Sequence, residues 1–149
     1  MQHPNIVWLH EIIDNPEKED DLYLVTEYHS NGSIGDIIKK INNVNYDHNK
    51  ECRKNGNFYR MKTKGLQNQQ ARNYFIDMLK ALFYCHKVVN VIHRDIKPDN
   101  IMINHNQEAV LIDFGVSFIM MKDTENDTTI ENLQGSRLYF APELLYDKE

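Results

Sequence analysis

One short stretch of the chain, residues 93–100, carries three kinds of polar side chain that could act together on a phosphate group. Phosphoryl transfer asks little covalent chemistry of a protein, and catalysis comes from positioning a hydroxyl, holding Mg²⁺ and offsetting charge on the phosphate oxygens. The carboxylate of Asp95 could accept the proton of that hydroxyl. Lys97 would point the same way as Asp95 in an extended loop and could lie against the phosphate. Asn100 supplies a neutral oxygen for a metal ion.

A second carboxylate and a third motif follow this stretch. Asp113 opens the triplet Asp-Phe-Gly at the end of the apolar run 110–112, and Ala-Pro-Glu stands at 141–143. Each feature alone has a structural explanation, with Asp95 as a loop cap, Asp113 as the end of a strand and Lys97 as a solvated side chain. Together they do not, because nothing structural requires an Asp-Lys-Asn loop and an aspartate after a buried strand in one chain.

The order H-R-D-x-K-P-x-N, D-F-G and A-P-E resembles the signature of eukaryotic protein kinases. The resemblance implies Asp95 as the base and Lys97 on the transferred phosphate, with Asn100 and Asp113 as further catalytic residues that bind Mg²⁺. It also implies ATP as the phosphoryl donor. A lysine at position 97 is the family's mark of serine/threonine specificity, so the implied substrate is a protein with a Ser or Thr hydroxyl.

The resemblance further implies an α+β, protein-kinase-like fold that is incomplete, with the last strands of the small lobe and the first half of the helical large lobe. Residues 1–29 would form small-lobe strands and the hinge, and residues 30–149 a partial large lobe with a polar insertion at about 39–65. Neither a Gly-rich phosphate loop nor an ATP-binding strand lysine can be assigned within the 149 residues. We therefore expect a kinase domain truncated at both ends.

Two functional classes stay open at this stage. In the first, the chain represents an ATP-dependent serine/threonine kinase; in the second, it is a non-catalytic kinase fragment or a pseudokinase-like binding module. Both can hold, because a longer gene product can be a kinase while these residues alone are not. Only six residues follow Glu143, so we expect this chain to lack the later helices that bury the central helix of the large lobe. We expect exposed core surface and marginal stability as a result.

Composition restricts the partners and the compartment. The 149 residues carry a formal net charge of −5, which gives no basic footprint for nucleic acid. The two cysteines form neither a disulfide framework nor a metal-ligand pattern, and no apolar run is long enough to cross a membrane. We expect a cytoplasmic or nuclear protein without a membrane partner.

The first part of the chain predicts two strands at residues 6–9 and 22–28, joined by an acidic turn at 14–21. They resemble the fourth and fifth strands of a kinase small lobe, which would make Leu9 a core residue. The resemblance also assigns residues around the nucleotide. These are Thr26 as the gatekeeper, Glu27, Tyr28 and His29 as the hinge that bonds adenine, Ser33 as a weak ribose contact, and Met102 under the adenine ring.

The segment from Lys39 to Lys64 is rich in asparagine, has few aliphatic residues and shows neither helical nor strand periodicity. We predict a polar, at least partly disordered insertion there. Its cations could contact an acidic partner, although a solvated loop is the simpler interpretation. These cations are Lys50, Arg53, Lys54, Arg60, Lys62 and Lys64.

Apolar residues recur at three- and four-residue steps from Gln69 to about Lys87, which predicts a long amphipathic helix with Asn68 as its N-cap. Tyr74, Phe75 and Met78 are predicted to be core residues of this helix. Two short apolar runs, 101–103 and 110–112, predict a hairpin. The resemblance places His93 and Phe114 in the hydrophobic spine that links the lobes.

The polar, acidic segment after Gly115 resembles a kinase activation loop. A phosphate on Thr128 or Thr129, added by an upstream kinase, could pair with Arg94. Ser136 stands where the family usually has a threonine that bonds the catalytic loop. The run D-F-G-V-S at 113–117 is shared with calcium/calmodulin-dependent protein kinase kinases, the nearest group that the sequence suggests.

Overall fold

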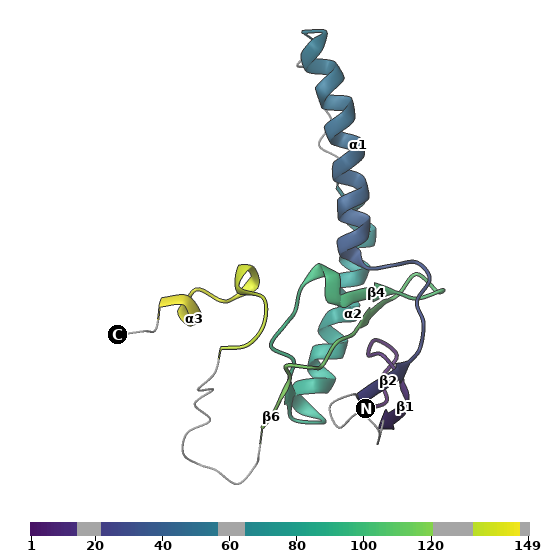
Figure 1. The fold of residues 1–149 in the computed structure, drawn as a ribbon, viewed down its shortest axis with the longest axis vertical. Coiled ribbons are helices and arrows are strands. Elements are labelled where there is room, and N and C mark those ends of the chain that lie inside the picture. The colour runs from purple at the N-terminus through teal and green to yellow at the C-terminus, as the bar shows by residue number, and fades with distance from the viewer. Residues whose placement is uncertain (15–21, 57–64, 121–132, 147–149) are drawn as a thin grey trace.

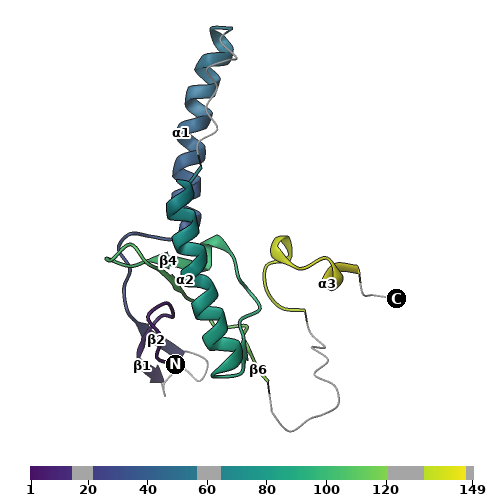
Figure 2. The same cartoon turned by 180° about the vertical axis from the view of Figure 1, so that it is seen from behind.

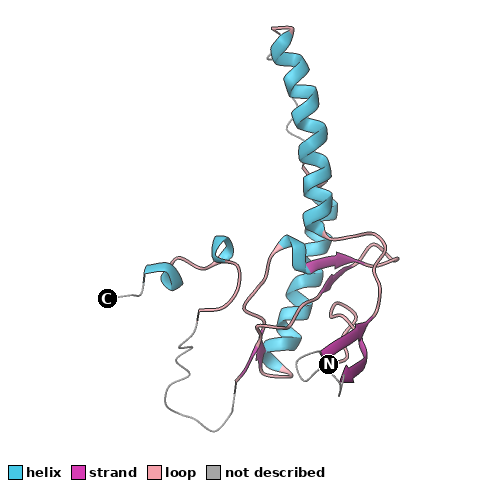
Figure 3. Ribbon diagram, in the orientation of Figure 1, coloured by secondary structure: helices cyan, strands magenta, loops and turns pink. Residues whose placement is uncertain are grey.

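The computed structural model describes residues 1–14, 22–56, 65–120 and 133–146. It has the expected α+β character, with helices and three two-stranded antiparallel sheets, β1–β2, β3–β6 and β4–β5 (Figures 1 and 3). The elements in chain order are β1 (Leu9–Asp14), β2 (Leu22–Thr26), α1 (Ile34–Lys54), α2 (Asn68–Lys87), β3 (Val91–Ile92), the 3-10 turn η2 (Pro98–Asn100), β4 (Ile101–Ile103), β5 (Ala109–Leu111), β6 (Phe118–Ile119), the 3-10 turn η3 (Arg137–Tyr139) and α3 (Glu143–Tyr146).

The core lies between α2 and the β4–β5 hairpin. One face of α2 is buried because its small and apolar residues recur at helical spacing and meet the hairpin. The buried side chains of α2 are Tyr74, Met78, Ala81 and Cys85. Opposite them lie Ile101, Ile103, Ala109 and Leu111. The predicted hairpin is therefore confirmed, with its second strand one residue earlier than expected.

The prediction that Phe75 belongs to the core is wrong. Its side chain is 64% exposed, and Leu79 and Phe83 on the same side of α2 are also exposed. The apolar residues of α2 cover more than one face, and the described part of the chain buries only the face with Tyr74 and Met78. The structure therefore shows exposed apolar surface on this helix, while its assignment as core that later helices would cover stays a prediction.

The N-terminal strands differ from the prediction in position. The first strand is Leu9–Asp14 rather than 6–9, and Ile6 instead forms a parallel bridge with Leu111. Backbone hydrogen bonds of Asn5 and Val7 with Leu111 hold this segment on the hairpin, and Asn5 Nδ2 adds a bond to the carbonyl of Ala109 at 2.8 Å. The prediction that Leu9 is a core residue is wrong, since it is 42% exposed in a β1–β2 pair whose residues are all exposed. The predicted acidic turn lies largely outside the described residues.

The prediction of an irregular, partly disordered segment from residue 39 is wrong as far as residue 54, because α1 runs without a break to Lys54. Ser33 and Asp36 form a capping box at its start, with Asp36 N donating to Ser33 Oγ at 3.0 Å and Ser33 N to Asp36 Oδ2 at 3.0 Å. Arg53 and Lys54 favour the last turn by facing the negative end of the helix dipole. Residues 57–64 lie outside the described residues, and with them the remaining predicted cations.

Helix α1 projects away from the rest of the molecule in both views (Figures 1 and 2). Only its first turns approach the loop at residues 93–100, where Lys39 Nζ pairs with Asp99 Oδ1 at 2.7 Å. Gly35 packs on the same aspartate so closely that a Cβ there would lie 2.7 Å from Asp99 Oδ1.

Helix α2 begins at Asn68, as predicted to within a residue, but Gln67 rather than Asn68 holds the N-cap position and makes no side-chain cap bond. Cys52 and Cys85 are buried free thiols, and Cys85 lies in the core on the covered face of α2. Among the described residues, no helix has the length and apolar content needed to cross a membrane.

Candidate functional site

The loop between β3 and β4 brings Asp95, Lys97 and Asn100 together. Asp95 is only 8% exposed, and its Oδ2 accepts hydrogen bonds from Lys97 Nζ at 2.6 Å and from Asn100 Nδ2 at 2.9 Å. The Asn100 amide also donates to the backbone carbonyl of Asp95 at 3.0 Å, which orients its side chain. The short turn η2 produces this proximity, because it folds residue 100 back onto residue 95.

Ser136 closes the site from a distant part of the chain. Its backbone N–H donates to Asp95 Oδ1 at 2.7 Å, and its Oγ accepts from Lys97 Nζ at 2.9 Å. Burial raises the pKa of Asp95, but hydrogen bonds from Lys97 and Ser136 outweigh it and lower the pKa to about 2. The hydrogen bond to Asp95 raises the pKa of Lys97. The pair is therefore ionised at neutral pH.

His93 connects this loop to the Asp-Phe-Gly segment. Its Nε2 lies 2.9 Å from the carbonyl of Ile112, and its Nδ1 accepts from the backbone N–H of Asp95 at 3.2 Å. These partners require a neutral ring protonated on Nε2, in agreement with burial lowering the pKa of His93. The ring meets Phe114 edge-on at 4.7 Å between centroids, so the two predicted spine residues pack against each other.

Asp113 follows β5 and lies close to Asn100 through the backbone, because Ile112 N donates to the carbonyl of Asn100 at 3.0 Å. Asp113 has a positive φ of 62°, uncommon for a residue with a Cβ, and its Oδ1 accepts from Gly115 N at 3.3 Å. The strand-to-turn change at this residue exposes the carboxylate to solvent.

The residues present fit a magnesium ion. The Asn100 amide nitrogen is engaged by Asp95, which leaves its oxygen as the atom able to ligate, and Asp113 adds an exposed carboxylate. Mg²⁺ prefers one or two protein oxygens completed by water and substrate phosphates. In the described ranges no group of three His, Cys, Asp or Glu side chains could hold a metal ion alone, so phosphate oxygens would have to complete this set.

The six predicted nucleotide residues are placed unequally. Thr26 lines a cavity of about 470 Å³ together with Asp113, Phe114 and Gly115. Ser33 and Met102 are neighbours in an isolated antiparallel bridge, but the Ser33 hydroxyl is engaged in the capping box.

The predicted hinge residues Glu27, Tyr28 and His29 are not among the residues that line this cavity. Glu27 Oε1 accepts from Trp8 N at 2.9 Å and lies 3.5 Å from Nε2 of the buried His29. Tyr28 between them is 87% exposed. The roles of all six residues toward a nucleotide stay predictions.

The sequence analysis missed two residues that shape the site. Asp99 links the loop at residues 93–100 to α1, and Gln134 accepts a hydrogen bond on Oε1 from the Arg94 guanidinium at 2.9 Å. Asp99 stands at a variable position of the H-R-D-x-K-P-x-N stretch and Gln134 lies outside the three motifs, and contacts that span 60 and 40 positions leave no local spacing signal. The predicted phosphate sites Thr128 and Thr129 lie outside the described residues.

Comparison with known proteins identifies the family of this chain. A family model described as the protein kinase domain matches residues 1–149. Similar proteins include the human SNF-related serine/threonine-protein kinase, 35% identical over 150 positions that cover 100% of this chain and 16% of the relative. The probable serine/threonine-protein kinase MARK-C of Dictyostelium discoideum is 31% identical over 145 residues, 97% of this chain and 15% of the relative. The serine/threonine-protein kinase ssp1 of Schizosaccharomyces pombe is 34% identical over 146 residues, 97% and 19% respectively.

The chain thus spans between 15% and 19% of the length of these three relatives. The suggested link to calcium/calmodulin-dependent protein kinase kinases stays a prediction. The match over the whole chain and the identities above 30% nevertheless define the family. The chain belongs to the protein kinase domain family, and within it to the serine/threonine kinases.

Proposed function

We propose that this chain carries the phosphoryl-transfer site of an ATP-dependent protein serine/threonine kinase. The observation that carries the proposal is the Asp95 carboxylate, which accepts from Lys97 at 2.6 Å and from Asn100 at 2.9 Å on one short loop. Asn100 and Asp113 would hold Mg²⁺, whose charge offsets that of the phosphates when it is bound.

Asp95 acts on the acceptor hydroxyl of the protein substrate. A carboxylate whose pKa is about 2 is a weak base, so Asp95 orients the hydroxyl by accepting its hydrogen bond and takes the proton only as the new O–P bond forms. The bond between the γ-phosphorus and the bridging oxygen breaks in the same displacement, and ADP leaves. Lys97, already beside Asp95, offers its ammonium to the phosphoryl oxygens.

Nucleotide binding tests the proposal directly. Thermal unfolding of the purified chain would be followed during titration with Mg²⁺-ATP, for the wild type and for Asp113→Ala. We expect ATP to raise the midpoint in the wild type only, because a ligand that binds the folded state stabilises it by mass action. Lys87→Ala, at an exposed position at the end of α2, is a matched control that should respond as the wild type does.

The second candidate is a non-catalytic binding module that uses the exposed apolar side of α2. Phe75 at 64% and Phe83 at 65% exposure are the observation that favours it. A wild-type midpoint that ATP does not move, or moves equally in Asp113→Ala, would contradict the phosphoryl-transfer site and leave this candidate.

A further inference from the structure

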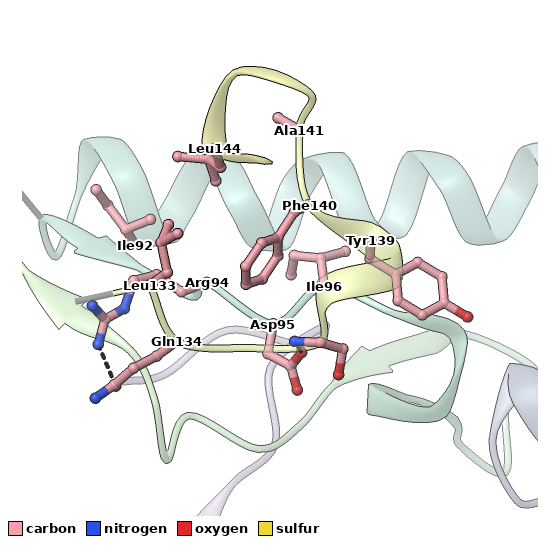
Figure 4. Close-up of a pocket in the computed structure, with 11 residues that line it drawn as sticks. Ile92, Arg94, Asp95, Ile96, Leu133, Gln134, Tyr139, Phe140, Ala141 and Leu144 are labelled. Carbon is pink, nitrogen blue, oxygen red and sulfur yellow. Dashed lines mark hydrogen bonds between the residues drawn. The ribbon is translucent and has the colours of Figure 1, made fainter. Parts of the chain in front are cut away.

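Arg94, next to the catalytic aspartate, is held by two uncharged acceptors from the segment that follows the Asp-Phe-Gly motif. Its Nε donates to the carbonyl of Val116, and one terminal nitrogen donates to Gln134 Oε1 at 2.9 Å (Figure 4). The guanidinium also lies over the ring of Phe118, 5.7 Å from its centroid. Arg94 has a positive φ of 67°, so its backbone adopts an uncommon conformation that these contacts help to maintain.

The two residues after Gln134 continue the contact along the same loop. Gly135 has a φ of +114°, and a Cβ there would lie only 2.3 Å from the carbonyl oxygen of Arg94, so no other residue fits this approach. Ser136 then bonds Asp95 with its N–H and Lys97 with its hydroxyl. Residues 134–136 are therefore attached to residues 94–97 at successive points.

Apolar packing between this segment and the loop is incomplete. A cavity of about 270 Å³ lies between parts of them, with Ile92, Ile96, Leu133, Phe140 and Leu144 on its walls (Figure 4). Leu133 and Leu144 are 44% and 45% exposed. Because these side chains leave a void, the polar contacts with the loop contribute more to the position of the segment.

We propose that Gln134 is a positioning residue that, through Arg94, holds Ser136 against the Asp95 carboxylate without a phosphate group. The inference rests on the proposed function, because the segment is held against the Asp95 carboxylate of the proposed phosphoryl-transfer site. The physical basis is the hydrogen bond from the Arg94 guanidinium to Gln134 Oε1. A neutral amide oxygen can accept a hydrogen bond from a guanidinium, as a phosphate oxygen would.

Two variants of similar size separate the hydrogen bond from the side-chain volume. Gln134→Met removes the acceptor, and Gln134→Glu keeps acceptor oxygens and adds a charge that favours Arg94. Gln69→Met is the control, because Gln69 is an exposed glutamine on α2 that bonds only locally to Asn73. The measurement is amide hydrogen exchange of peptides covering 133–140 in the purified full chain, resolved to the Ser136 amide.

We expect the Ser136 amide to exchange roughly three- to tenfold faster in Gln134→Met, and no faster than wild type in Gln134→Glu. Gln69→Met should leave it unchanged. Equal exchange in wild type and Gln134→Met would overturn the proposal, and so would a failure of Gln134→Glu to restore protection or a wild-type Ser136 amide that exchanges as in a free peptide. The readout needs neither nucleotide nor turnover, so it stays informative if the Mg²⁺-ATP titration fails.

Discussion

Asp95 should make the free energy of unfolding depend on pH. Burial raises its pKa, but hydrogen bonds from Lys97 and Ser136 lower it further, from 3.8 to about 2 in the folded chain. A group whose pKa is depressed by folding stabilises the protein while it is ionised. Its contribution is complete above the unfolded pKa and is lost as the pH falls from about 4 through about 2.

The size of this contribution follows from the two pKa values. Each unit of difference corresponds to about 1.4 kcal/mol, so a change from 3.8 to about 2 contributes about 2 kcal/mol at neutral pH. The Lys39–Asp99 pair on the surface makes a suitable comparison. Its side chains are 67% and 44% exposed, and such pairs contribute about 0–1 kcal/mol.

The assay is denaturant unfolding of the wild type, Asp95→Asn and Asp99→Asn from about pH 2 to pH 7. The difference in free energy of unfolding between wild type and Asp95→Asn should increase by about 2 kcal/mol from pH 2 to pH 5 and then level off. Loss of the partner of Lys97 shifts the whole curve but does not bend it, since Lys97 stays protonated throughout. A difference that stays constant with pH, or one matched by Asp99→Asn, would refute this account of Asp95.

Three further tests, made with four substitutions, address the fold around the site. Ser33→Ala removes the cap of α1, so we expect reduced helicity in circular dichroism and a loss of about 1 kcal/mol, while an unchanged spectrum would contradict the capping role. Gly35→Ala would place a Cβ 2.7 Å from Asp99 Oδ1 and 3.2 Å from its Cα, so hydrogen exchange in residues 98–100 should rise; unaltered protection there would show that the two elements are not in close contact. Met78→Ala, at a position that is 7% exposed, should lower the free energy of unfolding by roughly 2–5 kcal/mol. Phe83→Ala, at a position that is 65% exposed, should change it by less than about 1 kcal/mol. Similar losses for both variants in denaturant unfolding would mean that the buried and exposed faces of α2 are wrongly assigned.

Some elements were predictable because their causes are local. Asp95 and Asn100 are five positions apart, and the turn with Pro98 between them brings their side chains within 2.9 Å. The β4–β5 hairpin likewise follows from two apolar runs separated by a polar turn. The start of α1 was also predictable, since Ser33 and Asp36 have the spacing of a capping box. Its length was not, because the sequence after residue 39 lacks apolar periodicity.

The errors concern burial, which depends on what covers an element. Phe75 and Met78 both fit the periodicity of α2, yet only Met78 meets the hairpin. Leu9 lies in a strand, as predicted for the apolar segment, but in the described ranges no other element buries either face of the β1–β2 pair. Periodicity identifies a helix or a strand, and the neighbouring elements decide which of its faces is buried.

The sequence alone determined the family, the order of its motifs and the residue types at the site, because those depend on chemistry written within a few positions of the chain. The resemblance placed Ser136 at this loop, but only the tertiary structure decided which atoms meet there and that Gln134 also contacts the loop. Ser136 reaches Asp95 across 41 positions, and Gln134 reaches Arg94 across 40. The physical reason is that closing a long loop costs entropy, and a few polar contacts between distant residues must offset that cost. A pattern of residues within a short stretch of sequence carries no information about such contacts.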